Sequence, residues 1–545
     1  MCSNLILTQR YHNGLFFIQF FRCAISLYNE PFNIFLYILI FTLIFNNIPK
    51  PIQLNFLGGP VGSNLAVYPL IAAFAYTFYC QYKYKNVFVD IKPFLKYILV
   101  FISIMLLSTI VGLFNYPYYD LVLNGPVNQI EKLPKVLAFC HAHGVDVDSK
   151  LLMQAWIIAR QLKSVLMEAF WCFGGAYIIY CLIRNEKKCA LNVIGKAILC
   201  SAVIIIAYSV IELGWLANSN EAGKILSTIN PYIHSIKDDG KWWPPLLWNA
   251  QLRSIFAEPS YYGIYMAFAL PWFWYEIYNQ KSKLYMAVTF ILTFFLFGTK
   301  ARTAFVLHLG ELVIFTLCII CFTNRSKEML KHWGKIIAVS CAAFLAGNIF
   351  INQCMVTKQS EPLSIEKSMT QYVESNVASL ADPDQRSNRA RYSVMEADFK
   401  IGLAHPLIGV GKGLRSSYMP DYFSEKAFQN GEVKMWLSFR EKLGIMRSGF
   451  PRLGEYTTRF AESGILGLGI FLLPIVILLR KLYRKLKMSK DKMPYIAFTV
   501  SFCGILAAGI GDSLNITYCY WFLLGLGYAM CVDNTKKEKE SNESA

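Results

Sequence analysis

Charged residues are scarce in this chain. Only 16% of its 545 residues are Asp, Glu, Lys or Arg, whereas 55% are apolar, and the mean hydropathy is +0.38. A soluble globular chain carries about a quarter charged residues, so a soluble fold is excluded. The apolar residues form many separate runs rather than one anchor, which indicates an integral protein that crosses the membrane many times.

The connecting segments also lack clusters of metal-binding side chains. They hold no group of His, Asp and Glu at ligand spacing, and most of the 15 cysteines lie in apolar runs, where they pack as small hydrophobes. We therefore expect neither a metal ion nor another cofactor. The net charge of +18 does not indicate nucleic-acid binding, because basic residues of a membrane protein gather in its cytoplasmic loops and no basic helix carries base-stacking motifs.

The apolar runs predict an all-α fold, a polytopic membrane helix bundle of about twelve transmembrane helices. The predicted spans are residues 32–48, 65–81, 97–114, 164–183, 194–216, 260–278, 284–299, 303–323, 336–352, 460–479, 494–511 and 514–532. Lys and Arg follow every second span and fill the C-terminal tail. Because cytoplasmic loops are enriched in these residues, both termini are placed in the cytoplasm.

One connection is much longer than the others. Residues 353–459 separate the ninth span from the tenth, and a connection of such length is usually functional or disordered. Trp436 and apolar positions that recur around 392–403 favour order, so we expect two or three helices packed over the outer mouth of the bundle. The predicted organisation is a transmembrane bundle of about nine helices at 1–352, a large extracytoplasmic loop domain, partly helical, at 353–459, three transmembrane helices at 460–532 and a cytoplasmic tail at 533–545.

Two cations stand in a very short outer connection. Lys300 and Arg302 belong to the segment GTKART between the seventh and eighth spans, where the tendency of basic residues to stay inside should apply. An anion site would explain Arg302, because its planar guanidinium suits a phosphate group. A pair of cations that snorkels toward lipid headgroups is the alternative.

Arg253 and Glu258 precede the sixth span on the same predicted side. Pro259 is suited to the first turn of a helix, so the start of this span points free N–H groups outward, which favours an anion. One interpretation makes Arg253 a phosphate ligand and Glu258 a general base or the partner that orients the arginine. The other is a structural Arg–Glu pair at a helix entry.

The long connection holds further candidates. Arg389 and Arg391 stand in a run of arginines, either as substrate ligands or as a solvated charged face. His405 opens HPLIGVGKG, in which Gly411 is the middle one of three alternate glycines. The segment lacks the strand and the lysine position of a phosphate-binding P-loop. A tight turn that lets the backbone approach an acceptor or a lipid explains it better. With Lys300, these four residues are the candidate substrate-binding set.

Four stretches stand in a characteristic order. They are RSIFAEPSYYGIYMAF, a span ending FGTKARTAFVL, RARYSVMEADFKIGLAHPLIGVGKG and YTTRFAESGILGLGIFLLP. In order and spacing they resemble the O-antigen ligase and polymerase superfamily, over about residues 250–467.

The resemblance implies a glycosyltransferase of the bacterial cytoplasmic (inner) membrane, with its active site on the outer face. The donor would be a glycan linked to undecaprenyl pyrophosphate, and the chemistry would need no metal. Matched residue by residue, the functional arginines of the superfamily fall on Arg253 and Arg302, with Arg391 as a further match. The implied partners are lipid-linked donor and acceptor glycans and membrane lipid, with a chain-length regulator and a flippase as further ones.

The sequence departs from the superfamily at one point. Ligases carry a His shortly before the motif matched by residues 460–464, whereas residues 452–456 contain none and have Glu455 in a similar place. The departure favours a polymerase of repeat units over a ligase that transfers the glycan to a lipid or protein acceptor. A flippase or other transporter of lipid-linked oligosaccharides is the alternative of another class, although related halves, which are common in transporters, are not visible.

Overall fold

The computed structural model describes residues 31–57, 59–85, 87–123, 133–235, 251–324, 326–354, 386–446 and 448–532. Within these ranges the chain is helical and contains no strand. The predicted tail at 533–545 and residues 355–385 of the long connection lie outside them.

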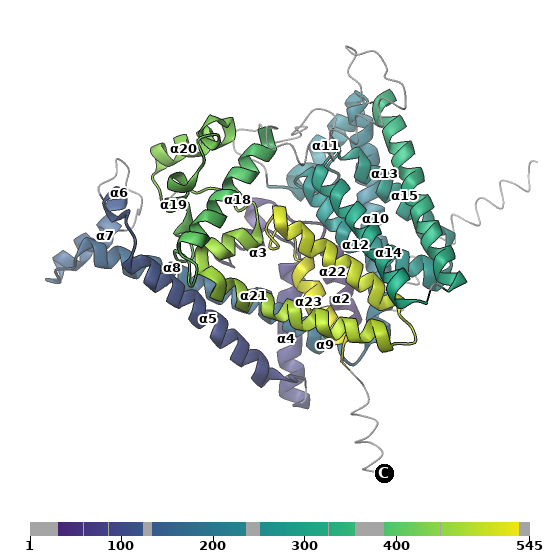
Figure 1. Ribbon diagram of the computed structural model, residues 1–545, viewed down its shortest axis with the longest axis horizontal. Coiled ribbons are helices and arrows are strands. Elements are labelled where there is room, and N and C mark those ends of the chain that lie inside the picture. The colour runs from purple at the N-terminus through teal and green to yellow at the C-terminus, as the bar shows by residue number, and fades with distance from the viewer. Residues whose placement is uncertain are drawn as a thin grey trace, which may run out of the picture.

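The helices follow one another along the whole described chain (Figure 1). In the first half they are α2 (Pro31–Thr42), η1 (Lys50–Ile52), η2 (Asn55–Leu57), α3 (Gly59–Gly62), α4 (Val67–Tyr84), α5 (Ile91–Phe114), α6 (Tyr119–Leu123), α7 (Leu133–Ala142), α8 (Ser149–Met167), η3 (Glu168–Gly174), α9 (Gly175–Ile183), α10 (Lys187–Leu216) and α11 (Asn220–Ile233). In the second half they are α12 (Pro259–Gln280), α13 (Lys283–Gly298), α14 (Arg302–Phe322), α15 (Lys327–Cys354), α18 (Arg386–Ala404), α19 (Arg415–Tyr422), η5 (Ala427–Gln429), α20 (Gly431–Leu443), α21 (Glu455–Met488), α22 (Met493–Gly511) and α23 (Cys519–Met530).

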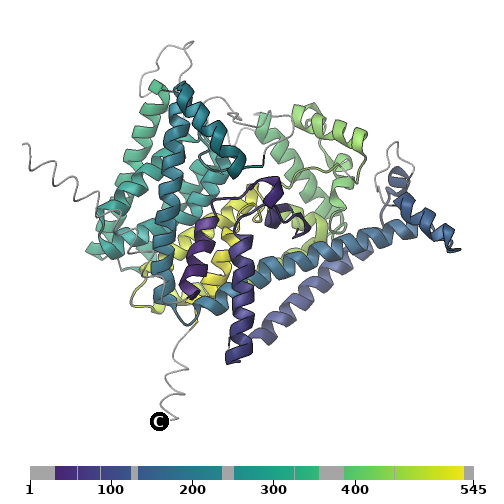
Figure 2. The ribbon, with the colours of Figure 1, turned by 180° about the vertical axis from the view of Figure 1, so that it is seen from behind.

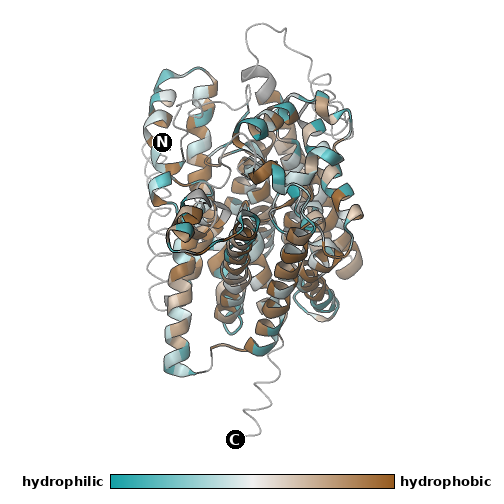
Figure 3. Ribbon diagram, turned by 90° about the vertical axis from the view of Figure 1, so that its left-hand side faces the viewer, coloured by the Kyte–Doolittle hydropathy of each residue, from teal (hydrophilic) through white to brown (hydrophobic). Residues whose placement is uncertain are grey.

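Several of these helices have the length and composition of membrane spans. Seven are long and apolar enough to cross a membrane: Ile91–Phe114, Ser149–Ile183, Lys187–Leu216, Arg302–Phe322, Lys327–Phe350, Glu455–Met488 and Met493–Gly511. Three shorter helices are also apolar: Asn33–Thr42, Lys283–Gly298 and Cys519–Met530. Hydrophobic residues cover the long helices, and hydrophilic residues gather toward their ends (Figure 3). The chain is therefore a helical membrane protein. Each predicted span overlaps a helix, while the count of twelve crossings stays a prediction.

The fourth predicted span is part of a longer helix. The prediction begins at residue 164, whereas α8 begins at Ser149 and continues through the π-helical turn η3 into α9. The α8 helix packs against α5, and its residues before 164 expose polar side chains such as Arg160 and Lys163, so this part of the sequence does not form an apolar run. Figures 1 and 2 show α5 and α8 side by side, running away from the bundle toward α6 and α7.

The α12 helix lies at the centre of the bundle, in contact with α13, α14 and α22. Its side chains are buried around the whole helix, including Trp272 and Trp274, as expected for a helix that is hydrophobic on every face. A Cβ on Gly263 would stand 2.5 Å from Ala304 Cα. This close approach places the first turns of α12 and α14 side by side.

The described part of the long connection forms α18, α19 and α20 beside this bundle (Figure 1). It has an apolar cluster of its own, with Val394, Ile401 and Leu414 among its members, which α5 and α8 join through Leu113 and Met153. The α18 helix packs along α21. Residues 386–446 and 448–454 are therefore docked onto the helical bundle, and their location outside the membrane stays a prediction.

Candidate functional site

The glycine-rich segment 405–413 is inserted at a break in α21. The helical geometry of α21 is interrupted at Gly464, where φ is 61° and ψ is −164°. Four backbone hydrogen bonds join the two segments: Val410 N to Ala461 O at 3.0 Å, Gly411 N to Glu462 O at 2.9 Å, Ile465 N to Pro406 O at 2.8 Å and Leu466 N to Leu407 O at 3.2 Å. Because lipid offers no hydrogen bonds to a polypeptide backbone, the segment supplies partners to the groups that the broken helix leaves open.

Glycine is required at this junction by conformation and by space. Gly409 has a φ of 69°, and a Cβ there would lie 2.4 Å from the carbonyl carbon of Glu462. A Cβ on Gly464 would lie 2.4 Å from the carbonyl oxygen of Leu407. Gly411, with a φ of 101°, lies against the backbone of α5 at Ser108. These glycines therefore let two backbones approach one another.

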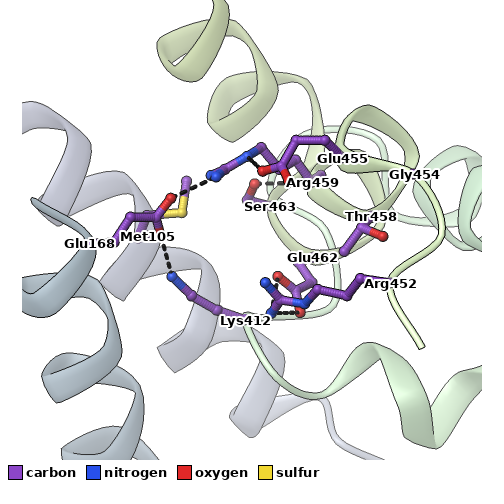
Figure 4. Close-up of a pocket in the computed structure, with 10 residues that line it drawn as sticks. All are labelled: Met105, Glu168, Lys412, Arg452, Gly454, Glu455, Thr458, Arg459, Glu462 and Ser463. Atoms are coloured by element: carbon purple, nitrogen blue, oxygen red, sulfur yellow. Dashed lines mark hydrogen bonds and ion pairs between the residues drawn. The ribbon is translucent and has the colours of Figure 1, made fainter. Parts of the chain in front are cut away.

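Charged side chains from three elements meet in a polar pocket beside this junction (Figure 4). Its lining residues are Met105, Glu168, Lys412, Arg452, Gly454, Glu455, Thr458, Arg459, Glu462 and Ser463. The Glu168 carboxylate accepts from Lys412 Nζ at 2.6 Å and from Arg459 Nη2 at 2.6 Å. Arg459 Nε also donates to Glu455 Oε1 at 2.5 Å, and Arg452 Nη2 lies 3.1 Å from Glu462 Oε1.

The polar pocket is filled by these ion pairs. Its cavity measures about 10 Å³, which is room for about one water molecule. The side chains of Glu168 and Lys412 are only 10% and 7% exposed, so their charges are compensated inside the protein. The arrangement fixes η3, the glycine-rich segment and α21 relative to one another rather than leaving space for a substrate.

A second group of polar side chains lies where α12, α18 and α22 meet. We call it the mouth cluster, and its members are Glu258, Tyr261, Arg391 and Asp512. Arg391 Nη1 donates to Gly511 O at 2.9 Å and lies 3.7 Å from Asp512 Oδ2. The charge of Arg391 also acts on the Glu258 carboxyl group and on Tyr261. The structure thus brings together two candidates that are far apart in the sequence, Glu258 and Arg391.

The two carboxyl groups of the mouth cluster bind protons more tightly than usual. The pKa of Glu258 is raised because the surrounding protein displaces water, although Arg391 and a hydrogen bond from Ser260 oppose the shift. Burial raises the pKa of Asp512 to about 6, against the attraction of Arg391 and with a contribution from Glu258. Glu258 is nevertheless exposed at the surface. An exposed carboxylate with a raised pKa is suited to accept a proton near neutral pH.

The mouth cluster and the polar pocket are connected through Glu455. While Glu455 Oε1 is held by Arg459, its Oε2 accepts from Ser513 Oγ at 2.9 Å and from Leu514 N at 3.1 Å. Asp512 directly precedes these residues. The segment 512–514 therefore joins the polar pocket, through Glu455, to the mouth cluster, through Asp512.

Arg253 lies in the segment before α12, and its side chain is buried in the protein. The residue is 5% exposed, and its side chain interacts with Tyr208 of α10. Glu212 of α10 accepts from Arg253 N at 3.2 Å and from Ser254 N at 2.6 Å. Glu258, the partner considered from the sequence, is thus replaced by Glu212 in these contacts.

Arg302 and Lys300 lie at the same end of the bundle as Arg253. Arg302 is the first residue of α14 and is half-buried. Lys300 has a φ of 48°, and burial lowers its pKa. Leu252 N donates to Gly298 O at 3.2 Å, which joins the segment before α12 to the turn before α14. The positive N-terminal ends of both helices are therefore close to the predicted arginines.

The remaining candidates are divided between the two ends of α18. Arg389 is half-buried in the first turns of α18, close to Arg391 in the sequence. His405 follows the other end, about 24 Å from Arg389 along the helix axis. There it packs edge to face on Tyr418, with ring centroids 5.8 Å apart, and lines a groove of about 270 Å³. Burial lowers the pKa of His405.

Sequence reasoning missed Glu168, Glu212, Glu462 and Asp512. Glu168 and Glu212 stand as isolated acids within apolar helices, and such residues mark functional or structural sites in membrane proteins. This signal was present in the sequence, whereas the arginine or lysine that each acid contacts was not readable from it.

These residues offer arginine and lysine donors for an anion and an accessible carboxylate for proton transfer. In the described ranges no three His, Cys, Asp or Glu side chains are grouped as metal ligands. Comparisons of the chain with models of known protein families and with curated proteins find no match.

Proposed function

We propose that this protein is a membrane glycosyltransferase that joins oligosaccharide repeat units, carried on undecaprenyl pyrophosphate, into a surface polysaccharide such as O-antigen or capsule. The mouth cluster is the observation that supports this most: the charge of Arg391 acts on the Glu258 carboxyl group. Each of the two belongs to a stretch that resembles the O-antigen ligase and polymerase superfamily. A base and an anion ligand at one accessible point are what transfer from a pyrophosphate requires.

The proposed reaction breaks the bond between the sugar and the pyrophosphate of the donor. The leaving pyrophosphate carries several negative charges, and Arg302 and Arg391 stabilise them. A hydroxyl group of the next lipid-linked unit attacks from the opposite face, and Glu258 accepts its proton. Arg253 supports the site from within, because its backbone is held by Glu212 of α10. The reaction needs no metal ion.

The proposed setting is the bacterial inner membrane, with about twelve crossings, both termini in the cytoplasm and the mouth cluster on the outer face. The lipid-linked donor and acceptor reach the site from the outer leaflet. A flippase supplies these units to that leaflet, and a chain-length regulator is the expected protein partner.

Within this superfamily, the contacts of Glu455 favour a polymerase over a ligase. Glu455 takes the place near which ligases carry a His, but Arg459, Ser513 and Leu514 already bind both of its oxygens. A carboxylate held in this way is a poor substitute for a mobile base. The transfer of glycan to a different acceptor by a ligase is therefore the less favoured variant.

A gel of extracted lipid-linked glycans tests the proposal. Deletion of the gene for a polymerase leaves carrier and surface glycans one repeat unit long. Deletion of a ligase leaves long chains on undecaprenyl pyrophosphate, and this outcome would refute the polymerase assignment.

The break in α21 favours a second candidate, a transporter of lipid-linked oligosaccharides. Transporters bind their substrates at interrupted helices, and α21 is interrupted at Gly464. Deletion of such a transporter traps single units on the cytoplasmic leaflet, where added glycosidases cannot reach them in intact spheroplasts. The gel and the accessibility assay together separate the three functions.

A further inference from the structure

An acid and a histidine are buried inside the helical bundle, away from the polar pocket and the mouth cluster. His308 and Glu311 lie on α14 and are 3% and 1% exposed. Glu311 stands about 13 Å along the helix axis from the start of α14, which is the middle of a candidate membrane span. Ionisable groups at such depth are rare and are functional by default.

The Glu311 carboxyl group has few polar neighbours among the described residues. Neither of its oxygens has a hydrogen-bond partner among the described residues. Gly504 of α22 faces it so closely that a Cβ there would lie 2.8 Å from Oε1 and 3.3 Å from Ala267 Cβ of α12. Gly504 of α22 thus faces this carboxyl group, Ala267 of α12 lies next to Gly504, and the helix of Glu311 itself presents His308.

His308 is the one polar side chain of the described residues with a recorded contact to Glu311. Its Nδ1 lies 3.9 Å from Glu311 Oε2, and its Nε2 lies 3.3 Å from Ser340 Oγ of α15. The edge of the ring packs on Trp274 of α12, with centroids 6.1 Å apart. The imidazole is therefore held between one carboxyl group and one hydroxyl group.

The surroundings of Glu311 favour one protonation state of its carboxyl group. An imidazolium and a carboxylate in an apolar interior would draw together to about 2.7–2.9 Å, the length of a charge-assisted hydrogen bond. An unpaired carboxylate would instead carry a large desolvation cost. At 3.9 Å the two groups form no such bond, and neither oxygen of Glu311 has a hydrogen-bond partner among the described residues, so the uncharged acid is the form that this site favours.

We propose that Glu311 and His308 form a proton-binding site inside the bundle, with the proton carried by the carboxyl group and the imidazole placed to accept it. Transfer from Glu311 Oε2 to His308 Nδ1 would convert the neutral pair into an ion pair of the same net charge. The space that Gly504 leaves free accommodates the protonated carboxyl group. A metal ion would need further ligands, which Ala267 and Gly504 do not provide.

Infrared spectroscopy of the purified full-length protein tests this site. The spectrum of the wild-type protein minus that of Glu311→Gln should show the carbonyl stretch of a protonated carboxylic acid near neutral pH. The exposed residue Glu221 provides a matched control, and Glu221→Gln should leave that band unchanged. A difference spectrum with a carboxylate band instead would overturn the proposal, because Glu311 would then be half of an ion pair.

A second variant keeps the test decisive if Glu311→Gln fails to fold. Gly504→Ala adds a methyl group that must displace the flexible end of Glu311, so the carbonyl band should shift in frequency but keep its intensity. An unshifted band would show that the protonated group lies elsewhere. Neither readout depends on glycosyl transfer, so the proton site and the proposed function fail or succeed separately.

Discussion

Glu258 in the mouth cluster carries a carboxyl group whose pKa is set by opposing effects. Burial raises the pKa, whereas the charge of Arg391 and a hydrogen bond from Ser260 lower it. If Glu258 is the base, the transfer rate rises with pH as its carboxylate forms. This rise, the acid limb of the pH profile, falls at a higher pH than the usual pKa of a Glu side chain. Glu258→Gln should reduce elongation of lipid-linked glycan by about 10²–10⁴-fold. Arg391→Gln should also move the acid limb to higher pH, because the carboxylate loses a cation that favours its charged form.

Lys400 supplies the control for this pH profile. It lies on α18, is 43% exposed and pairs with Glu396 at 2.6 Å, so Lys400→Gln removes a positive charge from the same helix without touching the mouth cluster. Its acid limb should match that of the wild-type protein. An acid limb that stays in place in Arg391→Gln would contradict the electrostatic influence of Arg391 on Glu258.

Glu168 is expected to contribute to stability rather than to chemistry. It neutralises Lys412 and Arg459, whose side chains are 7% and 9% exposed. Glu168→Gln keeps the shape but leaves two buried cations without their shared carboxylate, at a cost of about 3–5 kcal/mol. Thermal unfolding in detergent measures the loss. The exposed pair of Glu396 and Lys400 is the comparison, because Glu396→Gln should cost about 0.5 kcal/mol or less. Equal losses in the two variants would show that the polar pocket is hydrated and weakly coupled.

At the scale of elements, the break in α21 depends on Gly464. Its φ of 61° and ψ of −164° fall in a region that only glycine adopts readily, and another residue there costs about 1–3 kcal/mol from the backbone alone. A Cβ would also meet Leu407 O at 2.4 Å. We expect Gly464→Ala to separate segment 405–413 from α21, with a lower unfolding temperature and faster proteolysis of residues 386–446.

Gly469 of the same helix tests whether this loss is specific. A Cβ there meets nothing within 4 Å, so Gly469→Ala should be neutral or stabilise α21 by up to about 1 kcal/mol. Similar destabilisation of both variants would assign the loss to α21 as a whole and not to its break.

The sequence predicted the helices better than their interruptions. Apolar runs locate a membrane helix because its length and hydrophobicity are both local properties, and each predicted span accordingly overlaps a helix. The early start of α8 was missed because Arg160 and Lys163 are exposed on one of its faces. The break at Gly464 arises from hydrogen bonds with residues 406–411, which are distant in the sequence.

The candidate site was predictable only as a set of residue types. Arg391 and Glu258 were both selected, yet nothing in their local sequence indicates that they meet. Arg253 was selected for its charge, but its contact with Glu212 depends on how the segment before α12 folds against α10. Pairings of this kind follow from tertiary packing. A single sequence therefore shows which charged residues are available but not which of them contact one another.

At the scale of the whole molecule, the connections between helices gather at two ends of the bundle. At one end, Lys281 lies 3.7 Å from Glu328, and Lys492 Nζ donates to Phe322 O. These contacts join the turns after α12, α14 and α21. At the other end, Leu252 N bonds to Gly298 O, and Arg391 meets Asp512. The connections with most Lys and Arg, such as residues 480–492, belong to the first end.

This arrangement predicts the orientation of the protein in the membrane. The positive-inside tendency applies to short loops close to helix ends, so the end with Lys281 and Lys492 should be cytoplasmic and the mouth cluster external. Alkaline phosphatase folds only outside the cytoplasm, whereas green fluorescent protein fluoresces only inside. Inserted after Gly444, which follows α20, phosphatase should be active. Inserted after Ser489, between α21 and α22, only the fluorescent protein should give a signal. Phosphatase activity at Ser489 would show that the bundle has the opposite orientation. Arg391 and Glu258 would then lie on the cytoplasmic side, where a polymerase of flipped repeat units could not use them.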